Sequence, residues 1–182
     1  MVVSRATYEA VALEDSDTTW EYVCGQLREK PGMTQEHNSV AFYLAMAIAR
    51  QLARDKFEVR NNSGRLRTSA GNAFVPDVVV IPIDAVLSQA GTRKLETYDR
   101  AVPFVAETWS KSTGTYDSNT KIPEYKARGD LEIWRVLPYE RRIQAMRRRP
   151  DGTYVESEHS GGALEIASLG ISVDFDEVFG RI

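Results

Sequence analysis

The sequence Val-Pro-Asp-Val-Val-Val at residues 75–80 decides the fold of this chain. Its apolar run predicts a strand that is buried on both faces, and Asp77 stands where that strand begins. Pro76 has no backbone N–H to donate to a sheet, so we expect Asp77 at the end of the strand or at a distortion of it. A carboxylate at the mouth of a buried strand is the first candidate functional group.

A second carboxylate follows another apolar run, at residues 104–107, which read Phe-Val-Ala-Glu. If the two strands are neighbours, Asp77 and Glu107 converge in an apolar sheet. Two buried like charges are costly unless a cation neutralises them. Mg²⁺ suits such a pair, since it takes one or two protein carboxylates and fills its octahedron with water and phosphate oxygens. The alternative is that Asp77 caps a turn and Glu107 pairs with an arginine.

The surrounding segments predict one α/β domain, residues 1–182, in which a mixed sheet is flanked by helices. Residues 20–30 alternate around Gly25 like a short hairpin, and residues 36–54 carry apolar side chains at helical spacing. Pro-Asp-Gly at 150–152 favours a hairpin turn. The remaining expected strands lie at 57–60, 65–68, 77–81, 104–109 and 131–137, with hairpin strands at 141–149 and 153–158. A helix is expected at 118–129, and single helical turns are expected at 84–89, followed by a polar loop, and at 174–179.

The composition is that of a soluble globular protein, with 182 residues of which 42% are hydrophobic and 27% charged. The only long apolar stretch, residues 39–49, is too short to span a bilayer, and acidic residues near the N-terminus argue against a secretory signal. With one cysteine and two histidines, a disulfide, a cysteine-based zinc cluster and a histidine-rich metal site are excluded. We expect a cytoplasmic protein with no membrane partner and no nucleotide cofactor.

The net charge of −3 argues at first against a nucleic-acid partner, but the charge is unevenly distributed. Residues 111–150 hold 10 basic and 5 acidic side chains, whereas residues 151–182 hold 1 basic and 7 acidic ones. This asymmetry is compatible with a polyanion bound at the middle segment. Five arginines there could follow a phosphate backbone or protect an edge strand from further pairing: Arg141, Arg142, Arg147, Arg148 and Arg149.

An ordered pattern links these pieces to a known family. After Pro-Asp-(apolar)3 at 76–80 comes Glu-x-x-Ser-x-Ser-Thr at 107–113, and then Asp-x3-Lys-x3-Tyr-x3-Gly-x2-Glu-x-Trp at 117–134. This order resembles the Uma-two family of restriction endonuclease-like proteins, part of the PD-(D/E)XK nuclease-like superfamily. The resemblance extends over most of the chain, including the N-terminal hairpin, Glu36-His37 at the start of the first long helix, and the closing segment 163–179.

The resemblance implies a restriction-endonuclease-like PD-(D/E)XK core, with an N-terminal hairpin and a C-terminal β-hairpin, that hydrolyses phosphodiester bonds of DNA. Asp77 and Glu107 would hold Mg²⁺, with Mn²⁺ as a substitute, and a lysine would orient or deprotonate the attacking water. The superfamily usually places that lysine two residues after the glutamate, where this chain has Trp109. Family members supply a lysine from the following helix, which points to Lys121, with Lys111 as a second candidate.

Other polar residues near these motifs each have two readings. Glu36 could be an extra acid facing the metal or a first-turn glutamate that complements the helix dipole. His37 could lie near the site or simply open the helix, and Ser110 could bind Glu107, a phosphate or the backbone. Pro123 predicts that the helix begins near 118–120, which leaves Lys121 in the first turn, where the dipole does not favour a cation.

Two rival functions stay open beside the endonuclease. One is a nuclease-fold protein that binds nucleic acid or a protein partner without cutting, since the usual lysine position is changed and the net charge is acidic. The other is a structural dimer formed through the C-terminal hairpin. A homodimer is compatible with all three functions.

Overall fold

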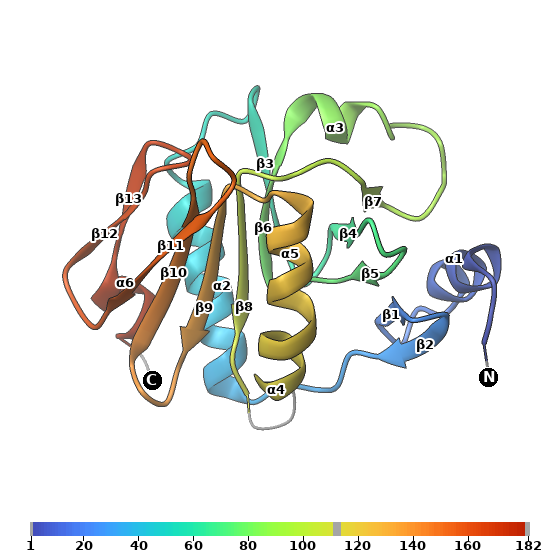
Figure 1. The fold of residues 1–182 in the computed structure, drawn as a ribbon, viewed down its shortest axis with the longest axis horizontal. Helices are drawn as coiled ribbons and strands as arrows, with labels where there is room; N and C mark the ends of the chain where they lie inside the picture. Colours follow the sequence, from blue (N-terminus) through green and yellow to red (C-terminus); the bar gives the residue numbers. More distant parts are fainter. Residues whose placement is uncertain (1, 111–113, 181–182) are drawn as a thin grey trace.

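The computed structural model of this chain describes residues 2–110 and 114–180 (Figure 1). None of its described helices is long and apolar enough to cross a membrane. The elements in chain order are α1 (Arg5–Glu14), β1 (Trp20–Val23), β2 (Gln26–Glu29), α2 (Gln35–Ala49), β3 (Phe57–Asn61), β4 (Arg65–Arg67), β5 (Ala73–Phe74), β6 (Val78–Pro82), α3 (Ile83–Leu87), β7 (Thr97–Tyr98), β8 (Phe104–Thr108), α4 (Gly114–Tyr116), a π-helical turn η1 (Asp117–Lys121), α5 (Ile122–Arg128), β9 (Glu132–Leu137), β10 (Arg142–Arg148), β11 (Tyr154–His159), β12 (Ala163–Ile166), β13 (Ile171–Asp174) and α6 (Phe175–Phe179).

A six-stranded mixed sheet forms the centre of the molecule. Its strand order is β11-β10-β9-β8-β6-β3, in which β8 and β9 are parallel and the other neighbouring pairs are antiparallel. The strand expected at 77–81 is β6, an inner strand whose residues 78–81 are fully buried. Because successive side chains of a strand point to opposite faces, such an apolar strand must be covered on both sides.

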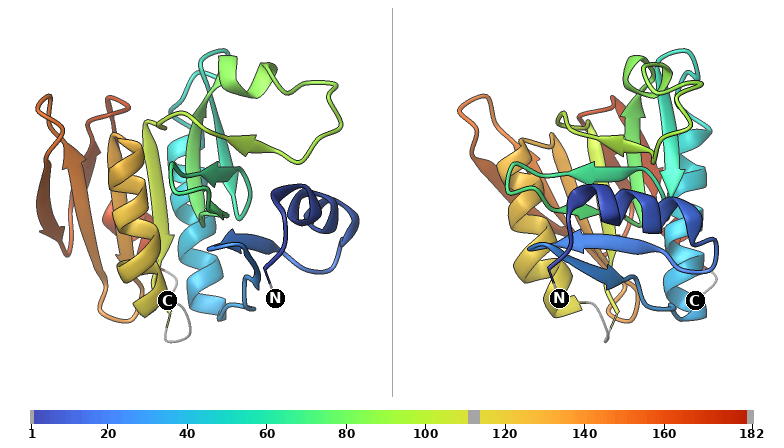
Figure 2. Two further views of the ribbon diagram at one scale, coloured as in Figure 1. Left: turned by 45° about the vertical axis from the view of Figure 1, so that its right-hand side comes forward. Right: turned by 90° about the vertical axis from the view of Figure 1, so that its right-hand side faces the viewer.

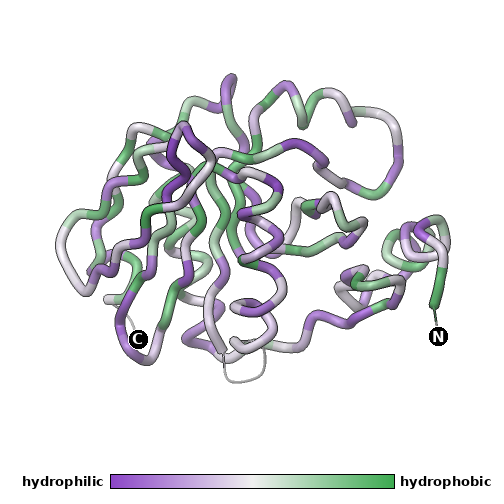
Figure 3. The backbone as a smooth tube through the Cα atoms, viewed as in Figure 1, coloured by the Kyte–Doolittle hydropathy of each residue, from purple (hydrophilic) through white to green (hydrophobic). Residues whose placement is uncertain are grey.

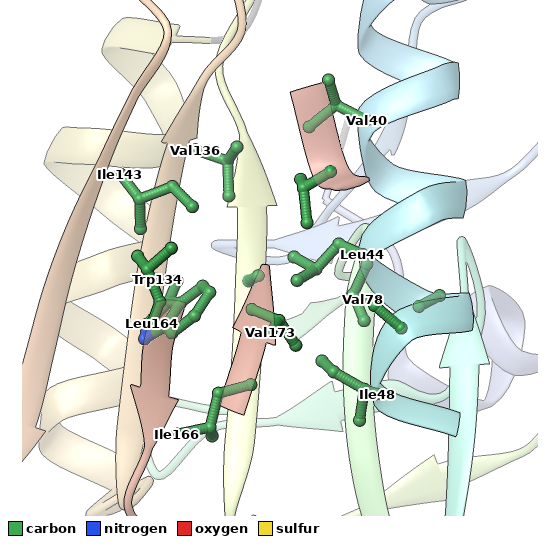
Figure 4. Packing of buried hydrophobic residues seen from close by; sticks show 14 of the residues in the cluster. Val40, Leu44, Ile48, Val78, Trp134, Val136, Ile143, Leu164, Ile166 and Val173 are labelled. Carbon is green, nitrogen blue, oxygen red and sulfur yellow. The ribbon is translucent and has the colours of Figure 1, made fainter. Parts of the chain in front are cut away.

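One face of this sheet is covered by α2 and the C-terminal elements. Val78 of β6 and Trp134 of β9 share a buried cluster with Leu44 of α2 (Figure 4). Leu164 of β12 and Phe175 of α6 belong to the same cluster. The apolar stripe that the sequence predicts for the first long helix is therefore the stripe that packs on the sheet.

The opposite face carries α5 and a second sheet. Val79 of β6 and Tyr125 of α5 lie in a second buried cluster, together with Phe74 of β5. The second sheet has the order β2-β1-β5-β4-β7, and α1 lies beyond it at the N-terminal end of the molecule (Figure 2). Apolar residues gather along the central strands and α2, whereas hydrophilic residues are more frequent in the outer loops (Figure 3).

The first long helix ends at Ala49, earlier than the expected end at residue 54. The N–H of Gln51 bonds to the carbonyl of Ile48, three residues back, which tightens the last turn. The Gln51 side chain donates to the carbonyls of Ala47 and Ser172. Gln51 was expected to continue the helix, but it satisfies free carbonyls at its end instead.

The helix expected to begin near 118–120 begins earlier, so that prediction is wrong. It starts at Gly114, passes through the π turn η1 and ends at Gly129, whose φ of +81° suits glycine. The wider π turn accommodates Pro123, whose ring would clash with a carbonyl of the preceding α-helical turn. Lys121 consequently lies inside a helical segment rather than in its first turn.

The hairpin predicted from Pro-Asp-Gly at 150–152 is formed by β10 and β11. The reading in which its arginines protect an edge strand is wrong for β10, because β10 pairs with β9 on one side and β11 on the other. The sequence did not predict α1, β5, β7, β12 or β13. Strands of two residues are too short to show a period, and α1 buries only Tyr8 and Ala12.

A buried ion pair fixes the connection between α5 and β9. Arg128 Nε lies 3.1 Å from Oδ2 of Asp130, whose other oxygen accepts a hydrogen bond from the Val102 N–H at 2.8 Å. Arg128 also donates to the carbonyls of Tyr98 and Arg100. Burial raises the pKa of Asp130 to about 6, against the opposing effects of Arg128 and the Val102 N–H. The pair is therefore structural and costly to break.

We expect Asp130→Ala to lower the free energy of unfolding by about 3–5 kcal/mol, because it leaves a buried guanidinium without its carboxylate. Urea denaturation with an unchanged slope measures this loss. The control is Arg142→Ala, which breaks the exposed Arg142–Glu158 pair and should cost about 0–1 kcal/mol. Equal, small losses in both variants would show that the buried pair has no special role.

Candidate active site

Asp77 and Glu107 lie next to each other at one end of the central sheet. β6 lies beside β8 in the central sheet (Figure 1). β6 begins directly after Asp77, and Val78 stands opposite Ala106 of the antiparallel β8. One further step in this register brings Asp77 opposite Glu107. The Thr108 N–H also donates to Oδ2 of Asp77 at 2.7 Å. The structure thus brings together the two carboxylates that the sequence places on separate strands.

Asp77 is buried and is held by groups from several elements. Lys30 Nζ, just after β2, lies 2.7 Å from Oδ1, and His37 Nε2, in the first turn of α2, lies 3.0 Å from Oδ2. Lys30 also donates to the side-chain oxygen of Asn62 and to the carbonyl of Val75. Burial would raise the pKa of Asp77, but Lys30 and His37 outweigh it and hold the pKa well below its ordinary value. Asp77 is therefore an ionised carboxylate.

Glu107 has a different environment. Its Oε1 accepts a hydrogen bond from the Tyr125 hydroxyl at 2.6 Å, and Lys121 Nζ lies 3.3 Å from Oε1 and 3.4 Å from Oε2. Burial raises the pKa of Glu107 to about 8; Lys121 opposes this shift, whereas Asp117 and Asp77 add to it. The pKa values of two neighbouring carboxyl groups are thus shifted in opposite directions, a pattern typical of functional sites.

Lys121 lies among three carboxyl groups. Its Nζ is 2.9 Å from Glu21, 3.3 Å from Glu107 and 3.6 Å from Asp117. Burial would lower the pKa of Lys121, but these acids raise it well above its ordinary value. The electrostatic mismatch expected for a lysine in a first helical turn does not arise, since α4 and η1 provide that turn and acids surround the ammonium group.

These groups line one small hollow at the end of the sheet. Its free volume is about 10 Å³, which is room for about one water molecule. Four acids, three cationic side chains and three less polar side chains line it: Glu21, Asp77, Glu107, Asp117, Arg28, Lys30, Lys121, Pro31, Met33 and Tyr116. The hollow thus places four acidic side chains beside three cationic ones.

The donor set suits Mg²⁺ in kind. Carboxylate oxygens are its preferred protein ligands, and one or two of them suffice because water and substrate oxygens complete the shell. In the described part of the chain, no three His, Cys, Asp or Glu side chains converge closely enough to hold a metal ion. Asp77 and Glu107 stand opposite each other where β6 and β8 adjoin, and this pair could hold the ion.

The structure separates the additional candidates. His37 is 1% exposed and lies beside Asp77, so the reading that placed it near the site has geometric support. Glu36 is half-buried in the first turn of α2 and forms no ion pair with a described residue. Ser110 is buried, and its carbonyl accepts a hydrogen bond from the Gly114 N–H. Lys111 lies outside the described residues.

The arginines of the β10 hairpin do not surround the hollow. β9 separates β10 from β8, and Arg147 stands opposite Glu132 at the end of the sheet where β8 begins. The hollow lies where β8 finishes, so the run 147–149 is at the far end of the sheet. Arg141 and Arg142 are nearer in register, but they contact α6 and β11 respectively. The geometry therefore gives these arginines no direct role at the hollow.

Trp109 occupies the position where the superfamily pattern would place a lysine, and it lies beside the start of α4. Its indole packs on Gly114, where an added Cβ would come within 1.7 Å of Nε1. Its ring also meets Tyr139 edge-on at 6.5 Å between centroids. Glycine at 114 therefore leaves room for the indole beside the start of α4.

Sequence reasoning missed Lys30 and Glu21. Lys30 follows the hairpin directly and looks like a solvated charge, whereas alternation in β1 draws attention to its apolar residues. Glu21 is nevertheless the buried residue of that strand, and its carboxylate accepts a hydrogen bond from the Val75 N–H at 2.9 Å. Tyr125, a tyrosine of the pattern at 117–134, is buried, and its hydroxyl donates to Glu107. Only contacts between distant segments reveal these roles.

Comparisons with known proteins identify a family and a similar fold. The model of the Uma2 family, described as "Putative restriction endonuclease", matches residues 5–176. A crystal structure described as a "putative nuclease belonging to DUF820 from Anabaena variabilis" superposes with a TM-score of 0.74 at 15% identity, covering 94% of this chain and 96% of that one. Comparison with curated proteins gives no match. The family resemblance and the restriction-endonuclease-like fold expected from the sequence are confirmed.

We expect Gly114→Ala to lower the free energy of unfolding by about 1–3 kcal/mol, because the new methyl group overlaps the Trp109 indole. Tryptophan fluorescence should change as well, since the ring must move. Thermal unfolding followed by fluorescence measures both effects. Gly161→Ala is the control, since an added Cβ there meets nothing within 4 Å. A Gly114→Ala protein as stable as this control would contradict the close packing.

Proposed function

We propose that this chain, which belongs to the Uma2 family, is a Mg²⁺-dependent endonuclease that hydrolyses phosphodiester bonds of DNA. The observation that carries the proposal is the facing pair Asp77 and Glu107 with Lys121 beside it, all buried in one hollow. The two carboxylates could hold a metal ion, and the ammonium group beside them could stabilise the negative charge that a phosphate gains during hydrolysis.

Asp77 and Glu107 would hold the metal, which supplies Lewis-acid polarisation of the phosphate when bound. The chain's own groups prepare these ligands. His37 and the Thr108 N–H orient Asp77, and the Tyr125 hydroxyl orients Glu107. Fixed second-layer contacts of this kind determine which carboxylate oxygens are available to a cation.

Lys121 would act on the water and on the phosphate. Its ammonium group lies within 3.4 Å of both oxygens of Glu107, so it presents N–H donors where the carboxylate pair faces the hollow. Such a group can orient an attacking water and offset the charge that develops on the phosphorane. Glu21 and Asp117 hold the ammonium in place from the other side.

We expect the purified protein to nick supercoiled plasmid DNA when Mg²⁺ or Mn²⁺ is added. Asp77→Asn, Glu107→Gln and Lys121→Met should each slow nicking by at least about a hundredfold, since each removes a proposed metal ligand or the ammonium group that would face the reacting phosphate. Gel analysis of nicked and linear products measures the rate. Glu158→Gln, at an exposed carboxylate of β11, is the control with unchanged activity.

We also expect Mg²⁺ to raise the melting temperature of the wild type, because a ligand that binds only the folded state stabilises it by mass action. At a free Mg²⁺ concentration of roughly 100 times the dissociation constant, this stabilisation is about 2.7 kcal/mol. Asp77→Asn and Glu107→Gln should lose the shift, while Glu158→Gln keeps it. A shift that survives in both site variants would place the cation elsewhere.

The rival function, DNA binding without cleavage, is favoured by one observation. Lys30 and Lys121 already neutralise Asp77 and Glu107, and no three potential metal ligands converge among the described residues. Under this rival the wild type would bind DNA and yet nick no DNA form with either metal. Asp77→Asn would then leave DNA affinity unchanged, which separates the two functions in one set of variants.

A further inference from the structure

We infer that Arg28 binds a backbone phosphate of the DNA at the mouth of the hollow. This inference rests on the proposed function and adds the residue that would hold the substrate. β2 is one of the two edge strands of the second sheet, and among the described strands it pairs with β1 alone. Arg28 stands opposite Glu21 in the β1–β2 register, so both side chains project from the same face toward the hollow that they both line.

The guanidinium of Arg28 is held in place by stacking. Its central carbon lies 3.6 Å from the centroid of the Tyr116 ring, a contact in which a cation is attracted to the face of an aromatic ring. The Tyr116 hydroxyl in turn donates to Oε2 of Glu21 at 3.2 Å, and Glu21 contacts Lys121 at 2.9 Å. This chain of contacts fixes Arg28 relative to the proposed reacting groups.

Arg28 is also the cation of the hollow whose charge is still available. Lys30 and Lys121 are buried and paired with carboxylates at 2.7 Å and 2.9 Å. Arg28 is exposed, and it forms no ion pair with any carboxylate in the part of the chain that the structure describes. Stacking uses the face of a guanidinium and leaves its N–H edge free, and that edge matches two phosphate oxygens.

The charge of the hollow explains why such a group is needed. Four acids line it, so an approaching phosphodiester is repelled unless cations face it at the entrance. The arginines of β10 lie at the other end of the sheet or contact α6 and β11, so they cannot supply this charge. Arg28 lies at the entrance and supplies it without disturbing the buried pairs.

The test measures binding of a short fluorescein-labelled DNA duplex by anisotropy in EDTA, where metal-dependent cleavage does not occur. We expect Arg28→Ala to weaken binding at least about tenfold, as for the loss of a charged hydrogen bond. The slope of log affinity against log salt should become shallower by about 0.9, the value for one phosphate contact. Arg28→Lys should fall between the two, since it keeps the charge without the planar edge.

The control is Arg54→Ala, which removes an exposed arginine. Arg54 lies beyond the C-terminal end of α2, whereas the site contacts the opposite end of this helix through His37. Arg54→Ala should bind DNA as the wild type does. Equal affinities of Arg28→Ala and the wild type would overturn the inference, as would equal losses in both alanine variants. Plasmid nicking by the wild type with Mg²⁺ is scored in parallel. If the wild type nicks DNA but Arg28→Ala binds DNA as the wild type does, the proposed function stands and the inference fails. If the wild type does not nick DNA but Arg28→Ala binds DNA more weakly, only the proposed cleavage is overturned.

Discussion

The structure depends on one electrostatic constraint, the burial of four acids against two lysines at the end of an apolar sheet. Each buried charge would be costly alone, so each must meet a partner of opposite sign or a hydrogen-bond donor. Asp77 meets Lys30, and Glu107 meets Lys121 and the Tyr125 hydroxyl. The partners come from the hairpin, the sheet and the helical segment 114–128, so satisfying the charges also fixes how these elements sit together.

The same constraint makes the hollow responsive to cations. A lysine carries a point charge on a flexible side chain, so the ammonium groups of Lys30 and Lys121 can shift. The pairing of β6 with β8 and the N–H of Thr108 fix the positions of the carboxylates. Under the proposed function, an incoming divalent ion competes with ammonium groups for oxygens that are already in place. Under that proposal Asp77 and Glu107 would have two uses: they pair with Lys30 and Lys121 in the absence of a cation, and they would be the ligands when one is present.

Most of the sheet could be predicted from the sequence because its inner strands leave strong local patterns. The run Val78–Ile81 and the turn at 150–152 specify β6 and the β10–β11 hairpin almost alone. The helical segment 114–128 was placed too late, because proline normally marks a helix start and a π turn has no recognised sequence signal. The short strands and α1 were not predicted, because their sequences show no clear hydrophobic periodicity.

The site was accessible to sequence reasoning only where carboxylates interrupt apolar runs or match a family pattern. Asp77, Glu107 and Lys121 have such signals, and the structure brings them together. Glu21 and Lys30 do not, since their roles depend on residues far away in the chain, such as Val75 and Asp77. The run of arginines at 147–149 is a prominent feature of the sequence that lies away from the hollow, and its contact with nucleic acid stays a prediction.

The separation of the hairpin from its partners along the chain has a consequence for folding during synthesis. Lys30 and Asp77 are 47 residues apart, and Tyr116 and Glu21 are 95 residues apart. The β1–β2 hairpin therefore leaves the ribosome long before the groups that neutralise it, and a short two-stranded hairpin is marginal in water by itself. Its contacts with the helical segment 114–128 can form only after that segment emerges, so the hollow closes late in synthesis.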